Sequence, residues 1–166
     1  IYLLGIKKIG YERFLSKLST VSFILLSAIS YFLSVVYTPQ NRILNVLNSV
    51  LSERIRLSQV GLQTWGVNLF GTSVNWNSES INYNYIDSSY INILVCYGLV
   101  IFVIVIVGFT LVNLRAKQVQ NFPLLFVLLM WAIRATIDPQ LFLIWFNPFI
   151  FYIGKSLLSY KAEEFI

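Results

Sequence analysis

Two uncharged apolar runs, each long enough to cross a bilayer, constrain this chain more than any other feature. The runs occupy residues 20–37 and 90–114, and neither contains Asp, Glu, Lys or Arg. A helix of about 20 apolar residues is what the hydrocarbon core of a membrane requires. Because 57% of the residues are hydrophobic and only 11% are charged, the sequence predicts an all-α, polytopic integral membrane protein.

Two further apolar segments follow, 122–137 with Arg134 near its end and 141–158 with Asn147-Pro148 as an expected kink. We therefore expect about four transmembrane helices and one large helical extracytoplasmic loop. The predicted order is a cytoplasmic basic juxtamembrane segment at 1–19, a span at 20–37, the loop at 38–89, a span at 90–114, a cytoplasmic loop at 115–121, a span at 122–137, an outer turn at 138–140, a span at 141–158 and a cytoplasmic tail at 159–166. The first residue is Ile1 and residues 1–6 resemble the end of an earlier apolar segment, so we expect a fragment of a longer protein that is inactive alone.

The basic residues are distributed unevenly between the two sides of the predicted spans. One side collects Lys7, Lys8, Arg13, Lys17, Arg115, Lys117, Lys155 and Lys161. The other side has Arg42, Arg54 and Arg56, with Arg134 inside a span. The positive-inside rule then places the loop 38–89 outside the cytoplasm. The outer basic residues are all arginine, whose planar fork suits phosphate or pyrophosphate.

Within the loop, the sequence predicts short helices followed by an irregular stretch. Thr38-Pro39 is expected to cap and begin an amphipathic helix that runs through 42–51. Ser52 is expected to cap a second helix that ends near Trp65, before Gly66. Residues 72–89 predict a loop or short hairpin, and Asp87 or Ser88 is expected to cap the next span.

Several classes of site are absent from the sequence. There is no histidine, no CxxC or HExxH motif and no Gly-rich phosphate loop, so we predict neither a metal site nor a cofactor. The single cysteine, Cys96, cannot form a disulfide framework. The net charge of +5 is explained by membrane topology, and we expect no nucleic-acid partner.

Two segments resemble a known family. The sequence LSERIRLSQVGLQTWGVNLFGTS at 51–73 and IDSSYINILVCYGLV at 86–100 are similar to the outer loop and the following span of Wzy-type polysaccharide polymerases. The resemblance implies a bacterial inner-membrane glycosyltransferase that joins undecaprenyl-pyrophosphate-linked oligosaccharide repeat units into O-antigen, capsule or exopolysaccharide on the outer face of the cytoplasmic membrane. Its expected partners are the lipid-linked oligosaccharide, the lipid bilayer, a chain-length regulator and a flippase.

The resemblance implies candidate site residues, each with a simpler structural interpretation. The catalytic candidates are Arg54, which would stabilise charge on the leaving pyrophosphate, and Asp87. The substrate-binding candidates are Arg42, Arg56 and Tyr90, together with two residues chosen for their chemistry and position: Trp65, whose ring could stack on a sugar, and Arg134, a charge inside a span. Alternatively, Arg54 is a solvated residue near a helix start, Asp87 a helix cap, the aromatic residues interface anchors, and Arg134 pairs with Asp138 or extends to the surface. The residues identify no general base.

Other functions remain open. An O-antigen ligase-type transferase would use a similar substrate, although such ligases tend to place a histidine in the outer loop. A lipid-linked glycan flippase or transporter would be expected to line a path through its spans with charges. A non-enzymatic membrane subunit would use the amphipathic helix after Pro39 as a docking surface.

Overall fold

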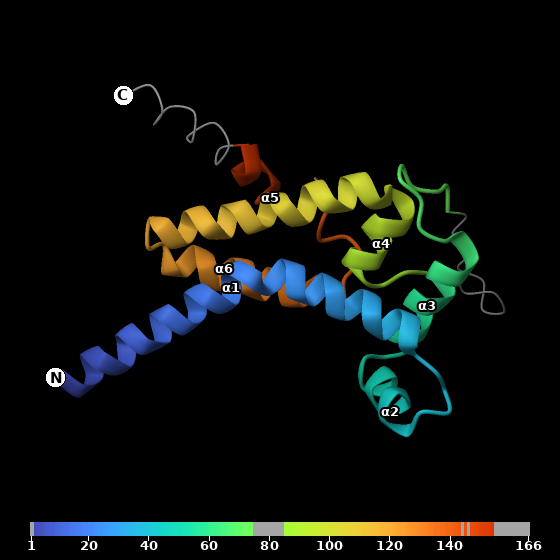
Figure 1. Cartoon of the computed structure of the whole chain (residues 1–166), viewed down its shortest axis with the longest axis horizontal. Helices are drawn as coiled ribbons and strands as arrows, with labels where there is room; N and C mark the ends of the chain where they lie inside the picture. The colour runs from blue at the N-terminus through green and yellow to red at the C-terminus, as the bar shows by residue number, and fades with distance from the viewer. Residues whose placement is uncertain (1, 75–84, 144, 146, 155–166) are drawn as a thin grey trace.

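Three helices lie side by side along the longest axis of the molecule (Figure 1). A computed structural model describes residues 2–74, 85–143, 145 and 147–154, with the backbone alone for 2–11 and 13. The bundle contains α1 (Tyr2–Val36), α5 (Gly98–Gln118) and α6 (Phe122–Arg134), while α2 (Arg42–Val50), α3 (Arg54–Trp65) and α4 (Ser89–Cys96) gather at one end. Every regular element within these ranges is a helix, which confirms the predicted all-α fold.

Aromatic side chains fill the centre of the bundle. Phe23 of α1 stacks on Phe109 of α5 with ring centroids 4.8 Å apart, and Tyr90 meets Phe142 edge to face at 5.2 Å. Such pairs add to the stabilisation from burial alone. Nearby, the Ser19 hydroxyl contacts the Asn113 side chain at 2.8 Å and the Leu125 carbonyl at 2.9 Å, which joins α1, α5 and α6.

Two of the described helices are long and apolar enough to cross a membrane. They are the segment Phe14–Val36 of α1 and the whole of α5, whereas α6 is apolar but shorter. Both helices expose large apolar side chains, among them Phe14, Ile24, Phe32, Val103 and Ile104. A soluble protein would bury most of these side chains. Together these helices suggest that the chain associates with a membrane.

The segment 90–114, predicted as one uninterrupted span, is broken between α4 and α5. Gly98 begins α5 with φ +85°, and a Cβ there would lie 2.3 Å from the backbone nitrogen of Gly71. The loop 66–74 therefore packs directly against the break. Its carbonyls accept the first N–H groups of α5: Leu99 N–H to the Asn68 oxygen at 2.9 Å, and Val100 N–H to the Leu69 oxygen at 3.2 Å. Because these contacts are long-range, the apolar pattern does not reveal them.

The amphipathic helix begins later than predicted. Asn41, rather than Thr38, is the N-cap of α2, and its side chain accepts the N–H groups of Ile43 and Leu44 at 3.0 and 3.3 Å. Asparagine is among the best capping residues, and here it satisfies two backbone donors at once. The N-cap position of the following helix is Glu53 rather than Ser52; Glu53 has a left-handed conformation with φ 68° and makes no side-chain capping bond.

The last predicted span, 141–158, begins with turns instead of a helix. Asn147 is fully buried, and its amide donates to the Leu141 carbonyl at 2.6 Å and accepts the Phe149 N–H at 3.0 Å. These bonds, and the proline that follows at position 148, disfavour helical backbone there. Residues 75–84 of the predicted loop, 155–158 of this span and the predicted tail 159–166 lie outside the described residues.

Candidate functional site

A polar pocket of about 420 Å³ opens where α3, the segment before α4 and the turn after α6 meet. We call it the charged pocket. It is lined by two arginines, two aspartates and four other residues: Arg54, Asp87, Arg134, Asp138, Tyr85, Ile137, Pro139 and Gln140. Three of the residues singled out in the sequence, Arg54, Asp87 and Arg134, therefore share one cavity.

Arg54 is the first residue of α3, and local hydrogen bonds fix the start of that helix. The side-chain oxygen of Asn48 accepts the Arg56 N–H at 3.0 Å, and the Asn48 carbonyl accepts the Glu53 N–H at 2.8 Å. The helix dipole disfavours a cation at this end. Asp87 offsets that cost, because its Oδ2 lies 3.6 Å from Arg54 Nε. This distance exceeds a hydrogen bond, and the buried Nε has no hydrogen-bond partner within the described residues.

Asp87 is held in place by its neighbour in the chain. Ile86 is fully buried and packs with Ile91 and Val95, and a Cβ on Gly61 of α3 would collide with it. Asp87 does not cap α4, since the N-cap is Ser88 and its side chain makes no capping bond. Burial raises the pKa of the Asp87 carboxyl above its ordinary value, and the Arg54 guanidinium opposes that rise only in part.

The second charge pair comes from the end of α6. Arg134 Nη2 lies 3.4 Å from Asp138 Oδ2, so the pairing expected from their four-residue spacing is confirmed. Ser89 anchors this turn to α4: its N–H donates to the Ala135 carbonyl at 2.9 Å, and its hydroxyl donates to the Asp138 carbonyl. The start of α4 thereby holds both aspartates beside the pocket.

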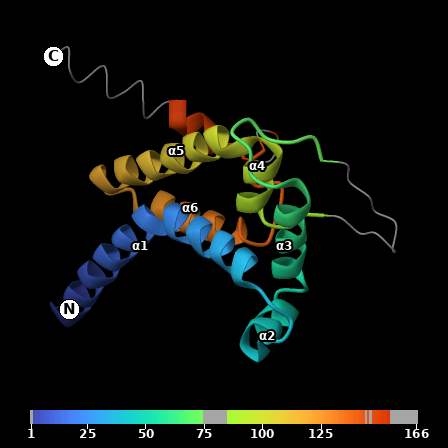
Figure 2. The same ribbon diagram turned by 45° about the vertical axis from the view of Figure 1, so that its right-hand side comes forward.

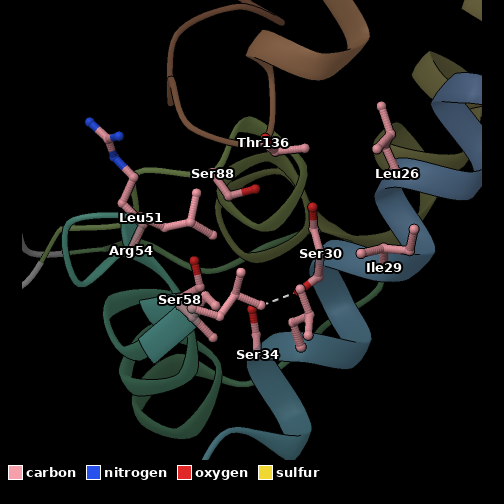
Figure 3. Close-up of a pocket in the computed structure, with 12 residues that line it drawn as sticks. Leu26, Ile29, Ser30, Ser34, Leu51, Arg54, Ser58, Ser88 and Thr136 are labelled. Carbon is pink, nitrogen blue, oxygen red and sulfur yellow. Dashed lines mark hydrogen bonds between the residues drawn. The ribbon is translucent and has the colours of Figure 1, made fainter. Parts of the chain in front are cut away.

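A second, mostly apolar cavity of about 220 Å³ adjoins the first through Arg54, which lines both. We call it the groove; it lies between α1 and α3 (Figure 3). Its lining is Leu26, Ile29, Ser30, Leu33, Ser34, Leu47, Leu51, Arg54, Ile55, Ser58, Ser88 and Thr136. Figure 3 shows the Arg54 guanidinium turned away from Ser30 and Ser34. Arg54 therefore stands at the boundary between an apolar cavity and a charged one.

The other predicted substrate-binding residues do not line the charged pocket. Tyr90 is fully buried, and its hydroxyl donates to the Ala132 carbonyl at 2.9 Å, so it belongs to the core. Trp65 packs against the buried cluster around Ile86. Arg56 pairs with Glu53 at 2.5 Å on the exposed side of α3, and Arg42 is exposed at the start of α2. Tyr90 and Trp65 were candidates because of their residue type and position in the chain, and neither property distinguishes a core residue from a site residue.

Four residues at or beside the pocket were not predicted as site residues: Asp138, Tyr85, Gln140 and Ser89. Asp138 carried a signal, because its spacing from Arg134 suggested an ion pair. Tyr85 lines the pocket beside Asp87, Gln140 reaches it on the turn after α6, and Ser89 does not line the pocket but holds that turn against α4. Among the described residues no cluster of His, Cys, Asp or Glu could hold a metal ion.

Comparison with known proteins gives no match, whether against family models, curated proteins or solved structures.

The raised pKa of the Asp87 carboxyl should make the stability of the folded protein depend on pH. A carboxyl whose pKa is higher in the folded protein stabilises the fold at low pH, and that contribution is lost as pH rises from its ordinary value of 3.8 through the raised pKa. In Asp87→Asn this titration is absent. We expect the difference between the Tm of the variant and the Tm of wild type, both measured in detergent, to increase as the pH rises from about 4 to about 7, because only wild type loses stability over this range. A Tm difference that stays constant or falls over this range would contradict the prediction.

Proposed function

We propose that this chain is part of a bacterial inner-membrane polymerase that joins polyprenyl-pyrophosphate-linked oligosaccharide repeat units. In this proposal the chain crosses the membrane about four times and holds its loop 38–89 outside the cytoplasm. The observation that carries the proposal is the position of Arg54, which borders both the apolar groove and the charged pocket. The resemblance of 51–73 and 86–100 to Wzy-type polymerases supplies the substrate class.

The two cavities suit the two ends of such a substrate. A polyprenyl-pyrophosphate sugar has an apolar chain, an anionic linkage and a polar glycan. The groove is lined by Leu26, Ile29 and Leu33 of α1, which suits isoprenoid units. The charged pocket contains Arg54 and Arg134. One guanidinium group can bind two phosphate oxygens at the same time. Arg54 would then contact the pyrophosphate where the apolar chain ends.

The proposed reaction uses these charges in the transition state. A hydroxyl of the acceptor glycan attacks the anomeric carbon, the bond from that carbon to the pyrophosphate oxygen breaks, and the pyrophosphate leaves with the electron pair. Arg54 and Arg134 stabilise the charge that develops on the leaving group. Asp87 is the carboxylate that takes the hydroxyl proton, and its raised pKa makes it a better base than an exposed aspartate.

The distribution of basic residues supports the proposed orientation. Arg115 and Lys117 lie in the last turn of α5, and this end of α5 is at the opposite end of the bundle from α3 (Figure 1). Under the positive-inside rule the end with Arg115 and Lys117 is cytoplasmic. The charged pocket would then face the outside.

Deletion of the gene for the intact protein tests the proposal. We expect single repeat units to accumulate on the lipid carrier at the outer face, because export continues while joining stops. Loss of all external lipid-linked intermediates would instead indicate a flippase. Normal single units and normal polymer, with finished polymer failing to reach its final acceptor, would indicate a ligase.

A further inference from the structure

Helix α2 contacts the rest of the protein through asparagine side chains, of which Asn48 is buried. Asn48 is 1% exposed; its amide donates to the Tyr37 hydroxyl at 3.2 Å, and its side-chain oxygen accepts the Arg56 N–H at 3.0 Å. The Tyr37 hydroxyl also contacts the Asn45 side chain at 3.5 Å. One row of asparagines therefore fixes α2 to the end of α1 and the start of α3.

The apolar side of α2 faces away from the protein. Ile43 is 79% exposed and Val50 is 74% exposed; between them Val46 is 58% exposed, and Leu47, at the edge toward the groove, is 36% exposed. These positions recur at three- and four-residue steps, so they form one continuous face. A helix on the surface of a water-soluble protein has the opposite arrangement, with its apolar face buried. We call this surface the outer face of α2.

The position of α2 indicates what covers this face. The residues just before it, Val35 and Val36 at the end of α1, are also exposed, and they end the candidate span Phe14–Val36. A span of that length ends at the bilayer surface. Only the turn at 37–41 separates it from α2. Figures 1 and 2 both show α2 set to the side at this end of α1, beyond α3.

We propose that α2 is an interfacial helix whose outer face lies in the boundary between headgroups and acyl chains of the bilayer. Helices of this kind bury their apolar side about 5–10 Å deep. The exposed Arg42 at its first turn is placed to meet lipid phosphates. Leu47 and Leu51 also line the groove, so lipid contact at α2 would put the groove at the depth of the outer acyl chains. The proposal stands on α2 alone and does not require the polymerase function.

Spin-label accessibility in the intact protein tests this. Single cysteines replace Val46 or Val50 in a Cys96→Ala background, and Thr64→Cys on α3, also exposed, is the matched control. Each variant carries a nitroxide and is placed in phospholipid nanodiscs. Collision rates are measured with oxygen, which concentrates in lipid, and with a nickel chelate, which stays in water. We expect the oxygen-to-nickel ratio at positions 46 and 50 to exceed that at 64 several-fold.

Two results would overturn the proposal. Equal nickel accessibility at 46, 50 and 64 would place the outer face in water. Protection of 46 and 50 from both reagents would mean that protein covers it, either another part of the intact chain or a partner. If the Val46 or Val50 variant fails to fold, the same comparison with Ile43→Cys decides, because that side chain is the most exposed of the face.

Discussion

Replacing Arg54 with alanine is expected to lower polymer synthesis by the intact protein about 100-fold to 1,000-fold, the usual effect of removing one donor that stabilises transition-state charge. Arg54 lines both cavities, and its loss also leaves Asp87 without its cationic neighbour. The measurement is the length and yield of polymer in cells that carry only the variant gene. Membrane levels of the protein are measured in parallel.

Arg56→Ala is the matched control for this experiment. Arg56 lies two positions further along α3, has the same charge, and pairs with Glu53 outside both cavities. An exposed pair of this kind contributes little, so we expect near-normal polymer. Wild-type polymer from Arg54→Ala would refute the proposed role of Arg54. An equal loss in both variants would indicate a general effect of removing charge from α3.

Replacing Gly98 with alanine is expected to destabilise the protein by about 3–5 kcal/mol, the sum of a strained positive φ and an overpacked contact. Gly98 has φ +85°, and its new Cβ would lie 2.3 Å from the Gly71 nitrogen and 2.5 Å from the Leu69 carbonyl oxygen. These are backbone atoms, which cannot rotate away. The loss is measured as a lower Tm and a smaller folded fraction in detergent.

Gly66→Ala separates strain from collision. Gly66 also has positive φ, +68°, but a Cβ there would have no atom within 4 Å. We expect it to cost about 1–3 kcal/mol, from backbone strain alone. If Gly98→Ala and Gly66→Ala lower the Tm equally, the close approach of the loop 66–74 to α5 does not contribute as described.

The candidate site was only partly predictable from the sequence. Arg54, Asp87 and Arg134 were chosen separately, as a loop arginine, a span-opening aspartate and a charge within an apolar segment. Asp87 meets Arg54 because the neighbouring Ile86 packs against Gly61 of α3, and Arg134 joins them because Ser89 hydrogen-bonds the turn after α6 to the start of α4. Such a long-range bond has no local pattern. Tyr90 shows the reverse case, since it was a substrate-binding candidate, and its burial and its hydrogen bond to the Ala132 carbonyl make it part of the core.

Hydropathy and helical length depend on consecutive residues alone, so the sequence predicted the all-α class and helices long enough to span a membrane, of which the described residues contain two. Tertiary structure decided where helices break and which charges meet. The apolar pattern of 90–114 predicts one helix, and the packing of the loop 66–74 against Gly98 breaks it. The hydrogen bond from Asn48 to Tyr37 determines which side of α2 faces the protein. Contacts between residues distant in the chain carry this information, and a local pattern cannot encode it.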